Sequence, residues 1–218
     1  MRRLLPHPLD QITAVEAYGV ARPRPVDRPW LGLCMVASVD GSTVVDQRSD
    51  ALSSAEDRNV LQTLRTLADV IVVGAGTVRV EGYRPPRKQG QRIGVVTRRG
   101  DIDLSLPLFT SGAGFLIMPR SAPERPVDTI RAGDDMLDLR AALQQFDADF
   151  VQAEGGPALN AALAEADLID ELNLTISPNL AGGDGPRVLA GASPIGRNLQ
   201  LAHLLEDDGF LFTRYLRR

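Results

Sequence analysis

Residues 151–160 read VQAEGGPALN and predict a buried strand that runs through a glycine pair into a helix. Gly155 and Gly156 allow the backbone to turn sharply and to approach a ligand without interference from a Cβ atom. Pro157 suits the first turn of a helix, where a missing N–H costs nothing. The unpaired N–H groups and the positive dipole end of such a helix favour a phosphate or pyrophosphate. Glu154 would repel a phosphate, so we expect its carboxylate to accept a hydrogen bond or to handle a proton.

A second glycine turn follows the strand within residues 68–79, which read ADVIVVGAGTVR. Thr77 stands where the next helix would begin, a favoured position for a helix cap or a phosphate contact. Ligands of open α/β sheets bind beyond the carboxyl ends of the strands, so the two turns suggest one extended ligand, such as a dinucleotide. Neither turn has the spacing Gly-x-Gly-x-x-Gly with an acidic residue about 20 positions later, which disfavours a standard Rossmann site.

The composition is that of a globular protein with one α/β domain. The 218 residues are 44% hydrophobic and 24% charged, which is enough to form a sizeable core. The net charge of −4 argues against a nucleic-acid partner and against an anionic membrane surface. The only cysteine, Cys34, excludes an internal disulfide and a multi-cysteine zinc site, and we expect no metal. Because no stretch has the length of a signal peptide or a membrane span, we expect a cytoplasmic protein.

Strand and helix patterns alternate along most of the chain. Residues 1–28 are expected to form an N-terminal extension, proline-rich and extended towards its end, followed by a single domain over residues 29–218. Strands are predicted at 31–37, 70–73, 93–97, 114–118, 127–130 and 149–153, and helices after the capping pattern at 53–56 and over 137–146 and 157–165. Strands 172–176 and 210–216 form a closing pair. This pattern predicts an α/β fold in three layers, a mostly parallel central sheet flanked by helices, with an antiparallel C-terminal edge.

Five motifs occur in an order that resembles a known family. They are ASVDG at 37–41, a helix that carries Asp57-Arg58 and Leu64-Arg65, VGAGTVR at 73–79, EGGP at 154–157, and residues 168–183. Over residues 29–216, these motifs resemble the reductase domain of riboflavin biosynthesis. The resemblance implies a dihydrofolate-reductase-like fold and an enzyme that reduces 5-amino-6-(5-phosphoribosylamino)uracil with NADPH, by hydride transfer to the ribosylamino carbon. It also implies a homodimer, in which strand 172–176 and the last strand lie at a sheet edge that meets the twofold mate.

The resemblance assigns roles to single residues. Ala37 and Thr77 would contact the cofactor, and Glu81 would take the place of a family aspartate near the nicotinamide. Glu154 would hydrogen-bond the pyrimidine, and Ser49 and Arg65 would contact the substrate. The pyrophosphate would lie on the turn and helix start formed by Gly155, Gly156, Pro157, Ala158, Leu159 and Asn160. Glu81 and Glu154 are therefore the catalytic candidates.

One basic turn is a candidate for cofactor selectivity. Arg98 and Arg99 follow a predicted strand and could bind the 2′-phosphate that distinguishes NADPH from NADH. An ordinary surface turn explains these two residues equally well.

Some positions depart from the family pattern. Cys34, which we expect to be buried as a small hydrophobe, stands where riboflavin reductases carry a lysine, and Ala51 stands where a tryptophan is frequent. The sequence thus retains more of the family's cofactor-binding residues than of its substrate-binding residues. Two alternatives stay open: a reductase of another pterin or folate-like heterocycle in the same fold, and a nucleotide-binding module without turnover. No strong general acid is evident, and the proton for an imine nitrogen can come from water.

Overall fold

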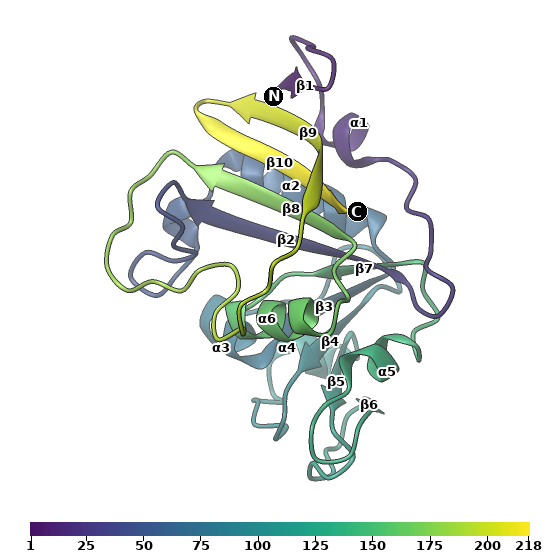
Figure 1. Ribbon diagram of the computed structural model, residues 1–218. Helices are drawn as coiled ribbons and strands as arrows, with labels where there is room; N and C mark the ends of the chain where they lie inside the picture. The colour runs from purple at the N-terminus through teal and green to yellow at the C-terminus, as the bar shows by residue number, and fades with distance from the viewer.

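The computed structural model describes all 218 residues, and ten segments form one β-sheet (Figure 1). The strands are β1 (Arg2–Leu5), β2 (Trp30–Ser38), β3 (Val70–Gly74), β4 (Arg92–Val96), β5 (Gly114–Met118), β6 (Thr129–Arg131), β7 (Phe150–Ala153), β8 (Glu171–Ser177), β9 (Leu199–Asp207) and β10 (Phe210–Arg217). The helices are α1 (Ala14–Tyr18), α2 (Ala55–Leu67), α3 (Ala75–Glu81), α4 (Pro107–Thr110), α5 (Leu139–Leu143) and α6 (Pro157–Glu165), with one 3-10 turn, η1 (Asp50–Leu52). None of these helices has the length and apolar character that crossing a lipid bilayer requires.

The order of strands across the sheet is β1-β9-β10-β8-β2-β7-β3-β4-β5-β6. From β8 to β6 neighbouring strands run parallel, whereas β1, β9 and β10 pair antiparallel with their neighbours. The predicted α/β fold class, with a mostly parallel sheet and an antiparallel C-terminal part, is confirmed.

Helices cover the two faces of the sheet in the expected three layers. Strand β3 shows the division, because Ile71 and Val73 pack with α3 and α4, whereas Val72 packs with α5 and α6 on the other face. Helices α1 and α2 pack against each other and against Leu205 of β9 and Phe212 of β10, and Figure 1 shows α2 behind β8 and β10. The continuous β-branched run of β3 is thus explained by burial on both sides.

Two helix starts differ in detail from the predicted ones. Helix α2 is capped by Ser54, whose side chain accepts the N–H of Asp57 at 3.0 Å, and not by Ser53. The Ser53 hydroxyl donates to the Asp57 carboxylate instead. The helix predicted over 137–146 is shorter and corresponds to α5. Asp138 fixes its start, because the Asp138 side chain accepts the N–H of Ala141 at 3.0 Å.

The first 28 residues are not simply an extended segment. Strand β1 pairs with β9, and α1 buries Tyr18 and its neighbours against the core beneath α2. The proline-rich part that follows has no regular structure, but two of its arginines hold it to the sheet. Arg22 pairs with Glu171 at 2.9 Å, and Arg28 forms two bonds of 2.5 and 2.8 Å with Asp170. The difference from the expectation arises because short elements without long periodicity can still be stabilised by tertiary packing.

Strands β8 and β10 lie inside the sheet rather than at its edge, which corrects the position expected from the resemblance. The edges are β1 and β6. Strand β8 also carries its polar residues on the helix-covered side, where Glu171, Asn173, Thr175 and Ser177 are buried. Its apolar residues, Leu172, Leu174 and Ile176, are only partly buried on the other side. The uncovered face of this strand is therefore the apolar one.

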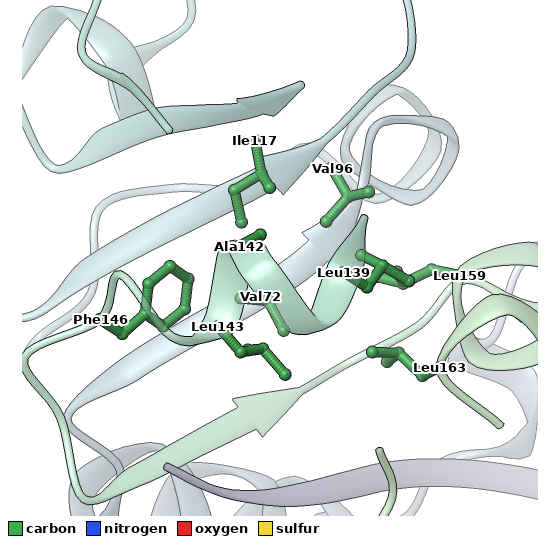
Figure 2. Close-up of a pocket in the computed structure, with 9 residues that line it drawn as sticks. All are labelled: Val72, Val96, Ile117, Leu139, Ala142, Leu143, Phe146, Leu159 and Leu163. Carbon is green, nitrogen blue, oxygen red and sulfur yellow. The ribbon is translucent and has the colours of Figure 1, made fainter. Parts of the chain in front are cut away.

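A small apolar void lies between α5, α6 and the sheet (Figure 2). Nine hydrophobic side chains surround a cavity of about 10 Å³. A water molecule needs about 10–15 Å³ and polar partners, so this void is a packing defect of the core and not a ligand site.

Candidate functional site

The two glycine turns predicted from the sequence meet at the carboxyl ends of β3 and β7. The N–H of Gly74 donates to the carbonyl oxygen of Gly155 at 2.6 Å. Gly155 has a φ of +85°, a conformation that side chains other than glycine rarely adopt. A Cβ atom on Gly156 would lie 2.6 Å from Oγ1 of Thr77. Gly155 is thus required by its backbone conformation, and Gly156 by the close approach of the Thr77 side chain.

A cavity of about 760 Å³ opens beyond these turns. Its size is in the range of small-molecule and cofactor sites. Gly156 caps α6 without a side-chain hydrogen bond, so the first N–H groups of this helix remain free for a ligand. Of the predicted cofactor residues, those that line the cavity are Thr77, Arg98, Gly156, Pro157, Ala158 and Leu159. Thr77 is the third residue of α3, whose cap is Gly74, so it contacts the cavity from within the helix and not from the cap position.

The cavity wall is basic although the chain is acidic overall. Arg79, Arg98 and Arg99 contribute positive charge, and Asp101 is the one acidic residue of the lining. Arg79 donates to the carbonyl oxygen of Asp101 at 2.7 Å, which leaves Arg98 and Arg99 after β4 as the basic groups without such a bond. An anionic ligand suits this wall.

Three predicted cofactor residues lie outside the lining. Ala37 is buried near the end of β2, and Gly155 is held in the turn behind the cavity. The amide of Asn160 donates to the carbonyl oxygen of Val188 at 2.9 Å, so this side chain holds the loop after β8.

A charged cluster forms around Glu154, directly after β7. Arg65 of α2 binds both carboxylate oxygens, at 2.7 and 2.6 Å, and the Tyr83 hydroxyl donates to one of them at 2.7 Å. Burial and the adjacent Glu154 charge raise the pKa of Tyr83 well above its usual value, which keeps this hydroxyl protonated as a donor. Burial opposes the charge of Arg65, but the carboxylate outweighs it and raises the pKa of Arg65. The sequence predicted Glu154 and Arg65 as separate site residues, and the structure shows that they form an ion pair.

Ser49 and Glu81, which were predicted separately, are also in contact. The Ser49 hydroxyl donates to Glu81 at 3.0 Å, and its backbone N–H donates at 3.3 Å. Glu81 is the last residue of α3, and Gly82 ends that helix in the left-handed conformation. Tyr83 follows at once, so one turn carries both Glu81 and the donor to Glu154.

Sequence reasoning missed Tyr83. Tyr83 lies in a proline-rich loop, where no periodicity marks a functional side chain. Cys34, expected to be buried, is partly exposed, although burial still raises the pKa of its thiol. No group of three or more His, Cys, Asp or Glu side chains is placed to hold a metal ion.

The chain is similar to known proteins in sequence and in fold. A model of the RibD C-terminal domain family matches residues 29–210. The 2,5-diamino-6-ribosylamino-4(3H)-pyrimidinone 5′-phosphate reductase of Archaeoglobus fulgidus is 28% identical over 193 residues, which cover 76% of this chain and 88% of that protein. The protein of the same name from Methanothermobacter thermautotrophicus is 26% identical, covering 77% of this chain and 86% of its own length.

Solved structures show the same fold. A pyrimidine reductase-like protein from Corynebacterium diphtheriae has a TM-score of 0.81 and 22% identity, covering 95% of this chain and 99% of its own. The riboflavin biosynthesis reductase Rib7 of Saccharomyces cerevisiae has a TM-score of 0.71 and 18% identity, covering 93% and 94%.

Proposed function

Because the chain belongs to the RibD C-terminal domain family, we propose that it is an NADPH-dependent reductase of a pyrimidine that carries a phosphoribosylamino group. Its curated relatives are named as pyrimidine reductases, so its class is that of oxidoreductases acting on a heterocyclic substrate. We also propose a cytoplasmic location, since a single cysteine requires no oxidising compartment and the relatives are biosynthetic enzymes.

The observation that carries this proposal is the junction between the basic cavity and the cluster around Glu154. Gly156 belongs to the cavity lining, and Glu154 lies two residues before it in the same turn. A dinucleotide in the cavity would thus end beside a group of polar side chains that suit a heterocycle. Two molecules bound in this way would lie side by side, as hydride transfer between them requires.

The residues of the cavity fit NADPH. Free N–H groups at the start of α6 suit the pyrophosphate, and the absence of a side chain at Gly156 allows the close approach. Arg98 and Arg99 suit the 2′-phosphate, which is the group that separates NADPH from NADH. When bound, NADPH supplies the hydride for the ribosylamino carbon.

The chain's own residues bind and orient the substrate. We assign contacts with the substrate to Ser49, Arg65 and Glu154, and a position near the nicotinamide to Glu81; the four residues form two hydrogen-bonded pairs. The Arg65–Glu154 pair presents donors and acceptors side by side, as a polar heterocycle requires. The proton for the nitrogen can come from water.

We further propose that the protein is a homodimer, joined through a sheet face and not through an edge. Leu174 of β8 and Leu204 of β9 flank Thr213 on this face, and Leu172 and Leu201 flank Tyr215. Leu199 and Leu201 each keep 36% of their surface exposed. A second copy that covers this apolar face would bury it by an isologous contact.

Steady-state oxidation of NADPH tests the function. The purified protein should oxidise NADPH with a phosphoribosylamino-pyrimidine, but slowly or not at all with NADH. Dihydrofolate serves as the comparison substrate for the alternative reductase. Turnover with dihydrofolate alone would contradict the proposal, and the absence of turnover with any heterocycle would favour a nucleotide-binding module.

A further inference from the structure

Met136, in the loop between β6 and α5, is an exposed methionine in the wall of the basic cavity. It keeps 70% of its surface exposed, and it lines the cavity beside Leu137. The other three methionines differ from it, because Met118 is fully buried and Met1 and Met35 are partly buried. Met136 is thus the one methionine that is largely open to solvent, and the function proposed above gives it no role.

The backbone of the loop that carries Met136 is held on several sides. The N–H of Asp138 donates to the carbonyl oxygen of Ala132 at 3.2 Å and closes the loop. Gly133 has a φ of +72° and accepts the N–H of Arg120 at 3.0 Å, and a Cβ atom on this glycine would overlap the carbonyl oxygen of Met136. The place of Met136 in the cavity wall is therefore set by the main chain and does not depend on the packing of its side chain.

The cavity has a basic wall and an apolar wall at the end remote from Glu154. Arg98 and Arg99 follow β4, whereas Met136 and Leu137 follow β6, and only β5 lies between these two strands. Figure 1 shows β4, β5 and β6 together at the lower end of the sheet. A nucleotide with its phosphate at the arginines would bring its flat base to the apolar wall. The polarizable thioether of methionine makes favourable contacts with such a ring.

An exposed thioether at this position is open to oxidation by a hydroperoxide. A lone pair of Sδ attacks one peroxide oxygen, the O–O bond breaks, and the proton of the transferred oxygen passes to the departing hydroxide, which leaves as water. The sulfur is oxidised by two electrons and the peroxide is reduced by two. The product, methionine sulfoxide, is polar and chiral and disrupts apolar contacts, and methionine sulfoxide reductases reverse the reaction.

Cys34 is the other sulfur that an oxidant could reach, because it is partly exposed. Burial, together with the charges of Asp57 and Glu154, raises the pKa of its thiol. Only the thiolate reacts readily, so this environment makes Cys34 slow towards peroxide. Oxidation should therefore reach Met136 first.

We propose that Met136 is a reversible oxidation site that controls cofactor binding: hydrogen peroxide converts it to the sulfoxide, the sulfoxide weakens the binding of the adenosine half of the cofactor, and bound cofactor shields the thioether. This inference rests on the function proposed above, because it takes the cavity to be the NADPH site. It adds a chemical control that acts on cofactor affinity and leaves the cluster around Glu154 unchanged.

Peptide mass spectrometry after mild treatment with hydrogen peroxide tests the site of oxidation. Met136 should be oxidised at least fivefold faster than Met35 or Met118. Saturating NADP⁺, which hydrogen peroxide does not oxidise, should protect Met136. Adenosine 2′,5′-bisphosphate should protect it equally well, whereas nicotinamide mononucleotide should not, because only the adenosine half would cover the apolar wall.

Titration with NADPH tests the control of binding. The oxidised protein should bind NADPH at least fivefold more weakly, and methionine sulfoxide reductase should restore the affinity. Met136→Leu keeps an apolar side chain of similar volume, so it should bind NADPH within twofold of the wild type and lose no affinity after peroxide. Met136→Gln should bind weakly without any oxidant. Val26→Gln is the matched control, an exposed apolar residue outside the cavity lining, and should change nothing.

The outcomes separate this inference from the proposed function. An unchanged NADPH affinity after complete oxidation of Met136, an equal loss in peroxide-treated Met136→Leu, or oxidation that NADP⁺ does not slow would each overturn the role of Met136 while the reductase function stands. At saturating NADPH and pyrimidine the oxidised protein should keep its kcat, and a lower kcat would place the damage elsewhere and overturn the inference. An untreated wild type that binds no NADPH would overturn the proposed function itself, and this inference with it.

Discussion

Gly156 and Thr77 approach each other so closely that a Cβ atom on the glycine would lie 2.6 Å from the threonine Oγ1. The contact joins the turn after β7 to helix α3, beside the backbone bond from Gly74 to Gly155. The two glycine turns thus form one continuous surface at the mouth of the basic cavity.

Gly156→Val should raise the dissociation constant of NADPH at least tenfold. A valine would push Thr77 away and occupy the space through which the pyrophosphate approaches the N–H groups of α6. Fluorescence titration measures the affinity, and circular dichroism should show an intact fold. Gly196→Val is a suitable control, because no atom lies within 4 Å of the position of its Cβ. An unchanged affinity in Gly156→Val would rule out this position for the cofactor.

Arg98→Ala should reduce the preference for NADPH over NADH. Removal of one charge-assisted contact with the 2′-phosphate should weaken the binding of NADPH about tenfold, which corresponds to about 1.4 kcal/mol. The affinity for NADH should not change. The ratio of the two dissociation constants is the measurement. Arg87→Ala, which removes an exposed arginine outside the cavity lining, should not change it. Equal weakening of both cofactors would show that Arg98 does not recognise the 2′-phosphate.

Glu154→Gln should lower kcat/KM by roughly ten- to a hundredfold with little change in NADPH affinity, because the loss concerns the substrate side. The variant also leaves Arg65 without its charged partner, so some loss of stability is expected. Tyr83→Phe removes only one donor to the same carboxylate and should have a smaller effect. If Glu154→Gln instead lost NADPH affinity and kept its efficiency at saturating cofactor, Glu154 would be a scaffold of the glycine turn.

Leu201→Arg should convert the proposed homodimer to a monomer. Leu201 lies on the uncovered face of β8, β9 and β10, where an arginine would bring a charge into the contact between copies. Light scattering at micromolar concentration measures the mass. Val15→Arg on α1 is the control, because Val15 is already 64% exposed on another surface. A wild-type monomer at this concentration would contradict the dimer directly.

His203 should make folding stability fall in weak acid. Burial, followed by the charge of Arg214, lowers the pKa of His203 to about 4. In the unfolded chain the residue takes a proton near pH 6.5, whereas the folded protein excludes that proton until about pH 4. Stability is therefore complete above pH 6.5 and is lost as the pH falls towards 4, by up to about 3 kcal/mol. Urea unfolding between pH 7 and 4.5 should show this slope, and His203→Gln should reduce it.

The sequence predicted the glycine turns at the cavity because backbone geometry alone requires these residues. Gly155 needs a positive φ, and Gly156 needs the absence of a side chain, so both constraints are visible as residue types. The strand and helix on either side of this pair were predicted over nearly the observed residues for the same reason. A constraint on the backbone conformation is visible in the local sequence as glycine at fixed positions.

The cluster around Glu154 could not be predicted to the same extent, because its groups meet only through tertiary contacts. Arg65 and Glu154 are 89 positions apart, and nothing in either segment indicates that they pair. The N-terminal helix α1 was missed although Thr13 and Glu16 form a capping box, because five residues are too few for a periodic pattern.

The position of β7 between β2 and β3 has a consequence for how the chain folds. Strand β7 is made long after both of its neighbours, so β2 and β3 cannot acquire their final partner until most of the chain exists. Such non-local pairing slows folding, and before β7 is in place β2 has no partner in the sheet and β3 has only β4. The glycine turns of the cavity belong to β3 and β7, so the cavity can form only once this strand has been inserted. Cofactor present during refolding should therefore stabilise the completed sheet without accelerating the steps that precede it.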